Sequence, residues 1–222
     1  ARVGHAELRE EWDAGFVFYG GQTYKGTDIN DVFKKTGANK SGVLFSGIVG
    51  TGKPWKKYYT RMAGVASPHN IDANVQAMQA LLPADHQPAP RPFLFSDELP
   101  ALGDFATSIA LAQKHGEYCS SFLYDETANV YLRFSGGEPY VDKTTQEQLS
   151  FSNVIIQRTK LTFYNGRNDS PVTANIGSGN ADIFIGGRYI PGYWRRSAMD
   201  QRTVFFDQVG NELKLQRGKT FI

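Results

Sequence analysis

The sequence predicts an α+β protein, with an N-terminal α/β portion and a C-terminal domain of mostly antiparallel strands that form a sandwich or a strongly twisted sheet. Residues 1–84 combine short apolar runs with helical patches. Residues 105–222 instead consist almost entirely of short strand-like runs separated by turn residues. Residues 85–104 overlap a proline-rich stretch, and proline fixes the backbone, so they are expected to form the linker and the start of the second domain.

Two strands are expected in the N-terminal portion. "AGFVFYGGQ" (14–22) is a continuous apolar run that ends at two glycines, which is typical of a buried strand. "GVLFSGIVG" (42–50) has the same character. Residues 72–82, "DANVQAMQALL", predict a helix because apolar residues recur at helical spacing. Asp72 is its expected N-cap, Asn70 is a competing cap, and Pro83 should stop it.

The C-terminal domain is expected to consist of hairpins. Three hairpins are expected: "SSFLYDETANVYLRF" (120–134) turning at a polar tip, "ADIFIGGRYIPGYW" (181–194) turning at Gly186-Gly187, and "RTVFFDQVGNELKL" (202–215) turning at 207–211. A turn at Gly136-Gly137 should lead into "EPYV". "NVIIQRTKLTFY" (153–164) is expected to form one long strand that is bent or bulged, and "KTFI" (219–222) a closing strand.

Composition excludes several classes of site. The single cysteine, Cys119, permits neither an intrachain disulfide nor a cysteine-based metal cluster. Four histidines are scattered without metal-ligand spacing, so no metal and no cofactor are expected. The formal net charge of +2 disfavours nucleic acid as a partner. Residues 188–222 are more basic than the rest, which would suit an anionic polymer, although a solvated surface has the same composition.

"GIVGTGKP" (47–54) resembles a phosphate-binding loop but lacks an essential part. Such a loop needs Ser or Thr after its lysine to hold Mg²⁺, and this sequence has Pro54 there. We therefore expect a glycine-rich turn and no nucleotide.

The segment that follows, "WKKYYTRM", has the spacing of a helix. Its basic residues and those just before it lie among aromatic rings, so they could hold single-stranded nucleic acid or a sugar-phosphate polymer, or simply cover aromatic surface with their aliphatic stems. These residues are Lys53, Lys56, Lys57 and Arg61.

Two further places carry candidate chemistry. His69 in "SPHN" (67–70) precedes the expected helix and could exchange a proton with a bound group, or only bond the turn. "GYWRRSAMDQRT" (192–203) combines an aromatic ring with arginines and an acid, which is typical of either an anion site or a structural ion-pair network. Its candidates are Trp194, Arg196, Asp200 and Arg202.

Three long stretches resemble the YerB-like lipoprotein family of Gram-positive bacteria, a two-part family of uncharacterised function. They are residues 124–157, 177–207 and 210–222, and "YGGQ" (19–22), "SPHN" and "FLFSDE" (93–98) match its N-terminal landmarks in order. By position the matched features are His69, Asn70, Gly177 to Gly179, Trp194, Arg196, Asp200 and Arg202. One departure is that Gly4 runs directly into "HAELREEWD", where the family has a basic segment containing serine.

The resemblance implies an extracytoplasmic protein held on the membrane by an N-terminal lipid anchor, which this sequence does not include. The first hypothesis is a non-catalytic envelope protein that binds an anionic wall polymer, a glycan or a protein partner. It would use Trp194, Arg196 and Arg202. The further predicted contacts are Lys56, Lys57, His69, Asn70 and Asp200. The alternative is a hydrolase of a phosphate- or sugar-containing wall component, with His69 as general acid/base. A purely structural interaction module is a third possibility.

Overall fold

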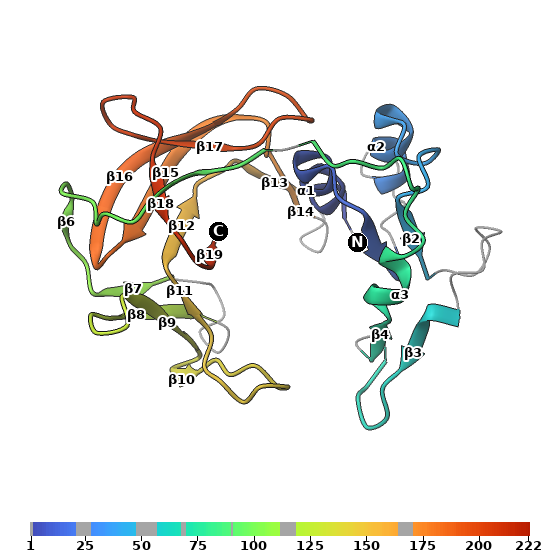
Figure 1. Ribbon diagram of the computed structural model, residues 1–222, viewed down its shortest axis with the longest axis horizontal. Helices are drawn as coiled ribbons and strands as arrows, with labels where there is room; N and C mark the ends of the chain where they lie inside the picture. The colour runs from blue at the N-terminus through green and yellow to red at the C-terminus, as the bar shows by residue number, and fades with distance from the viewer. Residues whose placement is uncertain are drawn as a thin grey trace. The chain divides into compact units, whose positions relative to one another are not determined.

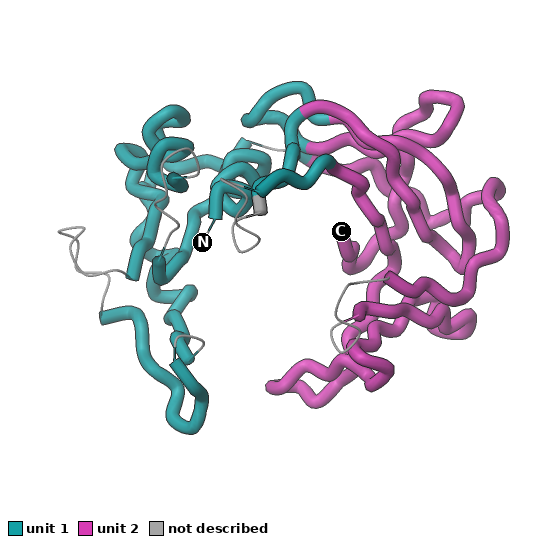
Figure 2. Tube along the Cα trace, turned by 180° about the vertical axis from the view of Figure 1, so that it is seen from behind, with its two compact units in different colours: residues 1–91, 160–176, 196–202 teal, residues 92–159, 177–195, 203–222 magenta. Residues whose placement is uncertain are grey.

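The computed structural model describes residues 2–20, 28–47, 57–67, 70–89, 91–111, 119–163 and 171–222. Strands predominate and the few helices lie near the N-terminus, as predicted (Figure 1). The chain forms two compact units (Figure 2). Unit 1 comprises residues 1–91, 160–176 and 196–202, and unit 2 comprises residues 92–159, 177–195 and 203–222. Among the described residues, no helix is both long enough and apolar enough to cross a membrane.

Unit 1 contains a small βαβ arrangement. Strands β1 (Phe16–Phe18) and β2 (Leu44–Ser46) pair in parallel, and helix α2 (Ile29–Thr36) lies between them in sequence. Asp28 caps α2 by accepting a 2.8 Å hydrogen bond from the Asn30 amide, and Gly37 ends it with φ near 79°. Helix α1 (Val3–Trp12) precedes β1. A core of Ala6, Ile29, Phe33, Ala38 and Val43 joins these elements.

The rest of the N-terminal segment differs from the sequence prediction. Residues 59–61 form β3 (Tyr59–Arg61) instead of a helix, because this segment pairs antiparallel with β4 (Ile71–Ala73). The short helix α3 (Val75–Gln79) follows. Its N-cap is Asn74, whose Oδ1 accepts from the Ala77 amide at 2.9 Å. Asp72, the expected cap, lies in β4, so the paired strand extends to a point where the helix was predicted to begin.

Two segments from the C-terminal half belong to unit 1. One contains the hairpin of β13 (Leu161–Phe163) and β14 (Pro171–Thr173), and the other is residues 196–202. The prediction of one long strand over 153–164 is therefore wrong, since β12 (Asn153–Gln157) lies in unit 2 and β13 in unit 1. Both segments also lie in the range that the sequence assigned to the C-terminal domain.

Unit 2 is built from two larger sheets and one parallel pair. The first sheet has the order β10-β9-β8-β7, with β11 also paired to β9, and the second has the order β17-β16-β15-β12-β19, with β6 paired to β16. Strands β5 and β18 pair in parallel. The bounds are β5 (Leu94–Ser96), β6 (Asp104–Phe105), β7 (Ser108–Ala110), β8 (Ser120–Asp125), β9 (Val130–Ser135), β10 (Glu138–Pro139), β11 (Ser150–Phe151), β15 (Gly177–Ile185), β16 (Arg188–Arg196), β17 (Val204–Asp207), β18 (Lys214–Gln216) and β19 (Thr220–Phe221).

Strand β12 shows how these sheets pack. Ile155 lies in one buried cluster with Ile183 and Trp194, whereas its neighbour Val154 lies in another with Phe122. Successive side chains of a strand point to opposite faces, so this sheet is covered on both faces along β12. The predicted α+β class with a strand-rich C-terminal part is confirmed, and of the two arrangements expected for that part, the packing along β12 is that of a sandwich.

The predicted hairpins are confirmed in part. Strands β8 and β9 pair along their whole length, and the turn between β15 and β16 has Gly186 and Gly187 at φ 58° and 70°. The third hairpin is shorter than expected, since β17 is joined to the following segment by a bridge at Glu212 while β18 pairs with β5. The closing strand β19 pairs in parallel with β12.

Candidate functional site

Trp194 belongs to the core of unit 2. It is 1% exposed, and its indole Nε1 donates a 2.8 Å hydrogen bond to the carbonyl of Arg158. Gly179 makes room for this contact, because a Cβ there would lie 2.5 Å from that carbonyl oxygen and 2.7 Å from the indole nitrogen. The ring is therefore a packing group, and the expected contact with a ligand does not fit its burial.

Arg196, two residues along β16, is equally buried but belongs to unit 1. Its side chain is fully covered, and its Nη1 lies 3.2 Å from the Glu11 carboxylate on α1. Its Nε donates to the carbonyl of Gln201, and its Nη2 donates to the carbonyls of Glu7 and Met199. The guanidinium thus ties residues 196–202 to α1. Of the two predicted roles, structural network and anion site, the burial of Arg196 favours the network.

Two further acids of α1, Glu7 and Glu10, also bond side chains from other elements of unit 1. Glu10 pairs with Arg9 at 2.7 Å and accepts a 2.9 Å hydrogen bond from the Thr36 hydroxyl of α2. Glu7 accepts a 2.8 Å hydrogen bond from the amide of Asn175. Burial raises the pKa of the Glu7 carboxyl, although that amide and the Arg196 charge oppose the shift. Helix α1 is therefore fastened to α2 and to the two C-terminal segments of unit 1 by polar side chains.

Asp200 and Arg202 are less buried than Arg196. Arg202 is partly exposed and Asp200 is exposed. Asp200 lies in the wall of a cavity of about 440 Å³ within unit 1. The remaining lining residues are Glu10, Lys35, Thr36, Ile176, Ala198 and Met199. Of the four candidates in 192–203, Asp200 is the one that the structure places at a cavity among the described residues.

A second candidate site lies where β3 meets the carboxyl ends of β1 and β2. The Tyr59 hydroxyl lies 2.6 Å from the Phe45 carbonyl and 3.0 Å from the Phe18 carbonyl, so it fixes β3 to both parallel strands. Burial raises the pKa of Tyr59. Its ring meets that of Tyr19 edge-on, with 5.9 Å between centroids. In α/β structures, ligands bind beyond the carboxyl ends of parallel strands.

Arg61 is the cation of this second site. Its Nη1 donates a 2.7 Å hydrogen bond to Oδ1 of Asn70, and its guanidinium carbon lies 5.9 Å from the centre of the Tyr19 ring. Arg61 is exposed and Tyr19 is 40% exposed. We call Tyr19, Tyr59, Arg61 and Asn70 the Arg61 site. An arginine held by an amide on one side and a ring on another is preorganised to meet an anion.

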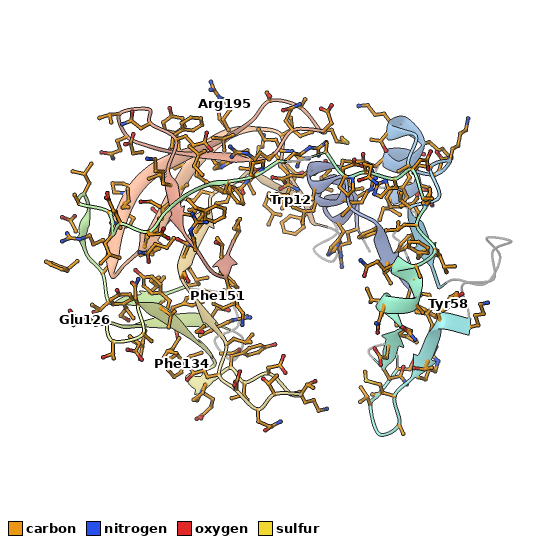
Figure 3. All side chains as sticks on the ribbon, viewed as in Figure 1. Trp12, Tyr58, Glu126, Phe134, Phe151 and Arg195 are labelled. Carbon is orange, nitrogen blue, oxygen red and sulfur yellow. The ribbon has the colours of Figure 1, made fainter. Side chains whose placement is uncertain are left out.

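Of the predicted contacts Lys56, Lys57 and His69, the structure describes only Lys57. Lys57 is exposed, and its ammonium lies 5.0 Å from the centre of the ring of Tyr58, the residue just before β3 that Figure 3 labels. Lys56 and His69 lie outside the described residues, as does most of "GIVGTGKP". The sequence did not single out Tyr19, although it stands first in the "YGGQ" landmark. Across the described part of the chain, no group of three or more His, Cys, Asp or Glu side chains could hold a metal ion.

Comparison with known proteins places the chain in a family. A model of the C-terminal domain of DUF3048, described as a protein of unknown function, matches residues 109–222, which is just over half of the chain. The chain belongs to the DUF3048 family. The crystal structure of the YerB protein from Bacillus subtilis has a similar fold, with a TM-score of 0.74 and 19% identity over 100% of this chain and 71% of that one. No curated protein sequence matches.

The predicted resemblance to the YerB-like family is thereby confirmed. The matched DUF3048 span begins in β7 and runs to the C-terminus, so it includes the segments 160–176 and 196–202 that belong to unit 1. The wall of the 440 Å³ cavity consequently combines family-domain residues, such as Ile176 and Asp200, with residues of α1 and α2.

Proposed function

We propose that this DUF3048 protein is a non-catalytic, extracytoplasmic envelope protein that binds an anionic wall polymer or glycan on the Arg61 site. The observation that carries the proposal is the fixed, exposed guanidinium of Arg61 between the Tyr19 ring and the Asn70 amide. Sugar-phosphate polymers offer both an anion for the guanidinium and a ring or chain for a tyrosine face.

The geometry of Arg61 favours a role in binding over the alternative that its side chain only covers aromatic surface. A lysine stem that merely covers aromatic surface keeps its rotamer freedom, as the exposed Lys57 can. Arg61, in contrast, is oriented by a hydrogen bond to the segment before β4 and by a ring beyond β1. Ordering a side chain before binding removes part of the entropy cost of association, so affinity for an anion is gained.

The envelope setting and the lipid anchor are part of the proposal. They are supported by the resemblance of residues 124–157, 177–207 and 210–222 to YerB-like lipoproteins and by the fold shared with YerB. Fractionation of cells that produce the full natural protein, with and without globomycin-type inhibition of lipoprotein processing, tests them. Recovery in the cytosol would contradict this part of the proposal.

The binding test uses purified anionic wall polymer, with a neutral glucan as the comparison ligand. Arg61→Gln should weaken binding by at least about tenfold, because one charge-assisted hydrogen bond contributes about 1.5–3 kcal/mol. The matched control is Arg195→Gln, which removes an exposed arginine from unit 2. Wild-type binding should also weaken as salt is added. Equal loss in both variants, or unchanged binding in Arg61→Gln, would contradict the Arg61 site.

A hydrolase is the second candidate function. It is supported by the hydrogen bond that Arg61 donates to Asn70, the residue that follows His69 in the sequence. Incubating the same polymer with the protein and measuring released phosphate or reducing ends distinguishes the two functions. Release that His69→Ala abolishes, with binding unchanged, would overturn the non-catalytic proposal.

A further inference from the structure

The cavity of unit 1 is a second place where a ligand could bind, separate from the Arg61 site. Its volume of about 440 Å³ lies in the range of small-molecule sites. Its wall comes from α1, from the last turn of α2, from the segment between β14 and β15, and from the loop after β16. All of these elements lie inside unit 1, so the cavity is formed within one compact body.

The wall has an apolar part and a polar part. Ile176, Ala198 and Met199 supply apolar surface, and Met199 can adapt its shape to a ligand because a thioether chain is flexible. The polar part contains the Glu10 and Asp200 carboxylates, the Lys35 ammonium and the Thr36 hydroxyl. The Glu10 side chain is only 9% exposed, so it is a carboxylate held in place by the fold.

The side chains that line the cavity carry a negative net charge. Arg9 is shared between two carboxylates, Glu10 at 2.7 Å and Asp13 at 3.0 Å, so it does not cancel both. Of the residues that line the cavity, Glu10 and Asp200 are acidic and Lys35 is basic, which is two acids minus one base, a net −1. Helix α2 also ends at this wall with Thr36, and the carboxyl end of a helix carries partial negative charge. Lys35 is exposed and can turn its ammonium toward solvent.

We propose that this cavity binds a protonated primary amine carried on a short aliphatic chain. The ammonium lies toward Asp200 and the Glu10 side of the wall, and the aliphatic part contacts Met199 and Ile176. This site is independent of the proposed function, because no residue of the Arg61 site lines the cavity.

The test compares two probes of the same shape. N-acetyl-lysine amide carries the ammonium and N-acetyl-norleucine amide lacks it, and calorimetry or NMR titration of the intact chain measures each Kd. The lysine probe should bind in the millimolar range, at least about fivefold more tightly than the norleucine probe. Equal binding of the two probes, or no saturable binding of the lysine probe up to about 20 mM, overturns the proposal.

Two substitutions should change the affinity in opposite directions. Asp200→Asn should weaken the lysine probe about threefold, and Lys35→Met should strengthen it about twofold, because a competing cation is removed. The control is Glu126→Gln, an exposed acid of unit 2 that Figure 3 labels, and it should change nothing. Both variants change exposed side chains, and their urea midpoints should match the wild type. Weaker binding in Lys35→Met overturns the proposal, because it would mean that the cavity holds an anion.

A last comparison identifies the source of the amine and separates this site from the proposed function. If n-pentylamine binds as tightly as the lysine probe, the ligand is a free amine; a preference for the lysine probe indicates a peptide-borne amine. Arg61→Gln should leave amine binding unchanged, and Asp200→Asn should leave polymer binding unchanged. Loss of both activities in either variant would contradict the independence of the two sites.

Discussion

At the residue scale, two neighbouring arginines of β16 differ in almost every interaction. Arg195 is exposed and lies over the Phe206 ring at 5.4 Å, and Figure 3 shows it pointing away from the sheets of unit 2. Arg196 is covered, pairs with Glu11 and donates to three carbonyls. We predict that Arg196→Met lowers the free energy of unfolding by about 3–5 kcal/mol, because it leaves the Glu11 carboxylate buried without its partner.

Arg195→Met is the matched control for this prediction. An exposed cation over a ring contributes about 0.5–1 kcal/mol, so this variant should lose no more than that. Urea denaturation followed by circular dichroism measures both values. If the two variants lose the same amount, the Arg196 network does not stabilise unit 1 as inferred.

Glu7 gives a prediction that depends on pH. Burial raises its pKa in the folded state above the ordinary value of 4.5, so the folded protein holds this proton more tightly than the unfolded chain. The free energy of unfolding therefore falls as pH rises from the unfolded pKa through the folded pKa. Glu7→Gln removes this contribution, and its stability relative to wild type should be greater at pH 7 than at pH 4. Urea midpoints at the two pH values measure the difference, and a difference that does not change with pH would contradict it.

At the scale of elements, helix α3 shows where local sequence signals compete. Asn74→Ala should destabilise the protein by about 1 kcal/mol, because the Ala77 amide loses its acceptor at the start of a helix that buries Met78. Asp72→Ala, at the cap that the sequence favoured, should cost less than about 0.5 kcal/mol, because Asp72 is exposed in β4. Thermal unfolding of the two variants measures both losses of stability. A larger loss in Asp72→Ala than in Asn74→Ala would mean that Asp72 is the N-cap, as the sequence predicts.

Elements with strong local signals could be predicted, and elements set by distant partners could not. The turn at Gly186-Gly187 requires positive φ, which glycine supplies, so the β15–β16 hairpin is encoded locally. The strand at 59–61 has helical spacing but pairs with β4, and that partner was missed because a helix was predicted to begin at Asp72. The parallel pairs β5–β18 and β12–β19 join segments far apart in the chain and were likewise not foreseen.

The same distinction between local signals and contacts with other segments applies to the candidate sites. The sequence predicted Trp194 and Arg196 as ligand contacts, but composition alone could not distinguish a buried network from a binding surface. Tyr19 and Arg61 meet because Tyr59 fixes β3 to the ends of β1 and β2, a contact between residues distant in sequence. Asp200 gains its cavity from helices near the N-terminus.

At the scale of the whole molecule, unit 1 depends on chain segments that follow residue 159. Figure 2 shows residues 160–176 and 196–202 in the colour of unit 1. They supply Asn175 to Glu7 and Arg196 to Glu11, both acids of α1. A fragment of residues 1–91 keeps the apolar core around Phe33 but leaves these carboxylates without their partners.

We therefore predict that the fragment 1–91 shows no cooperative unfolding transition in urea, whereas the intact chain does. Residues 92–222 contain all of unit 2, with its two larger sheets and their buried clusters, and this fragment should retain a cooperative transition. Near-ultraviolet circular dichroism of both fragments provides a second measure of fixed aromatic packing. A cooperative transition of 1–91 at the midpoint of the intact chain would mean that residues 160–176 and 196–202 add little to unit 1. In that case the boundary between the domains would lie in the proline-rich segment, as the sequence alone predicts.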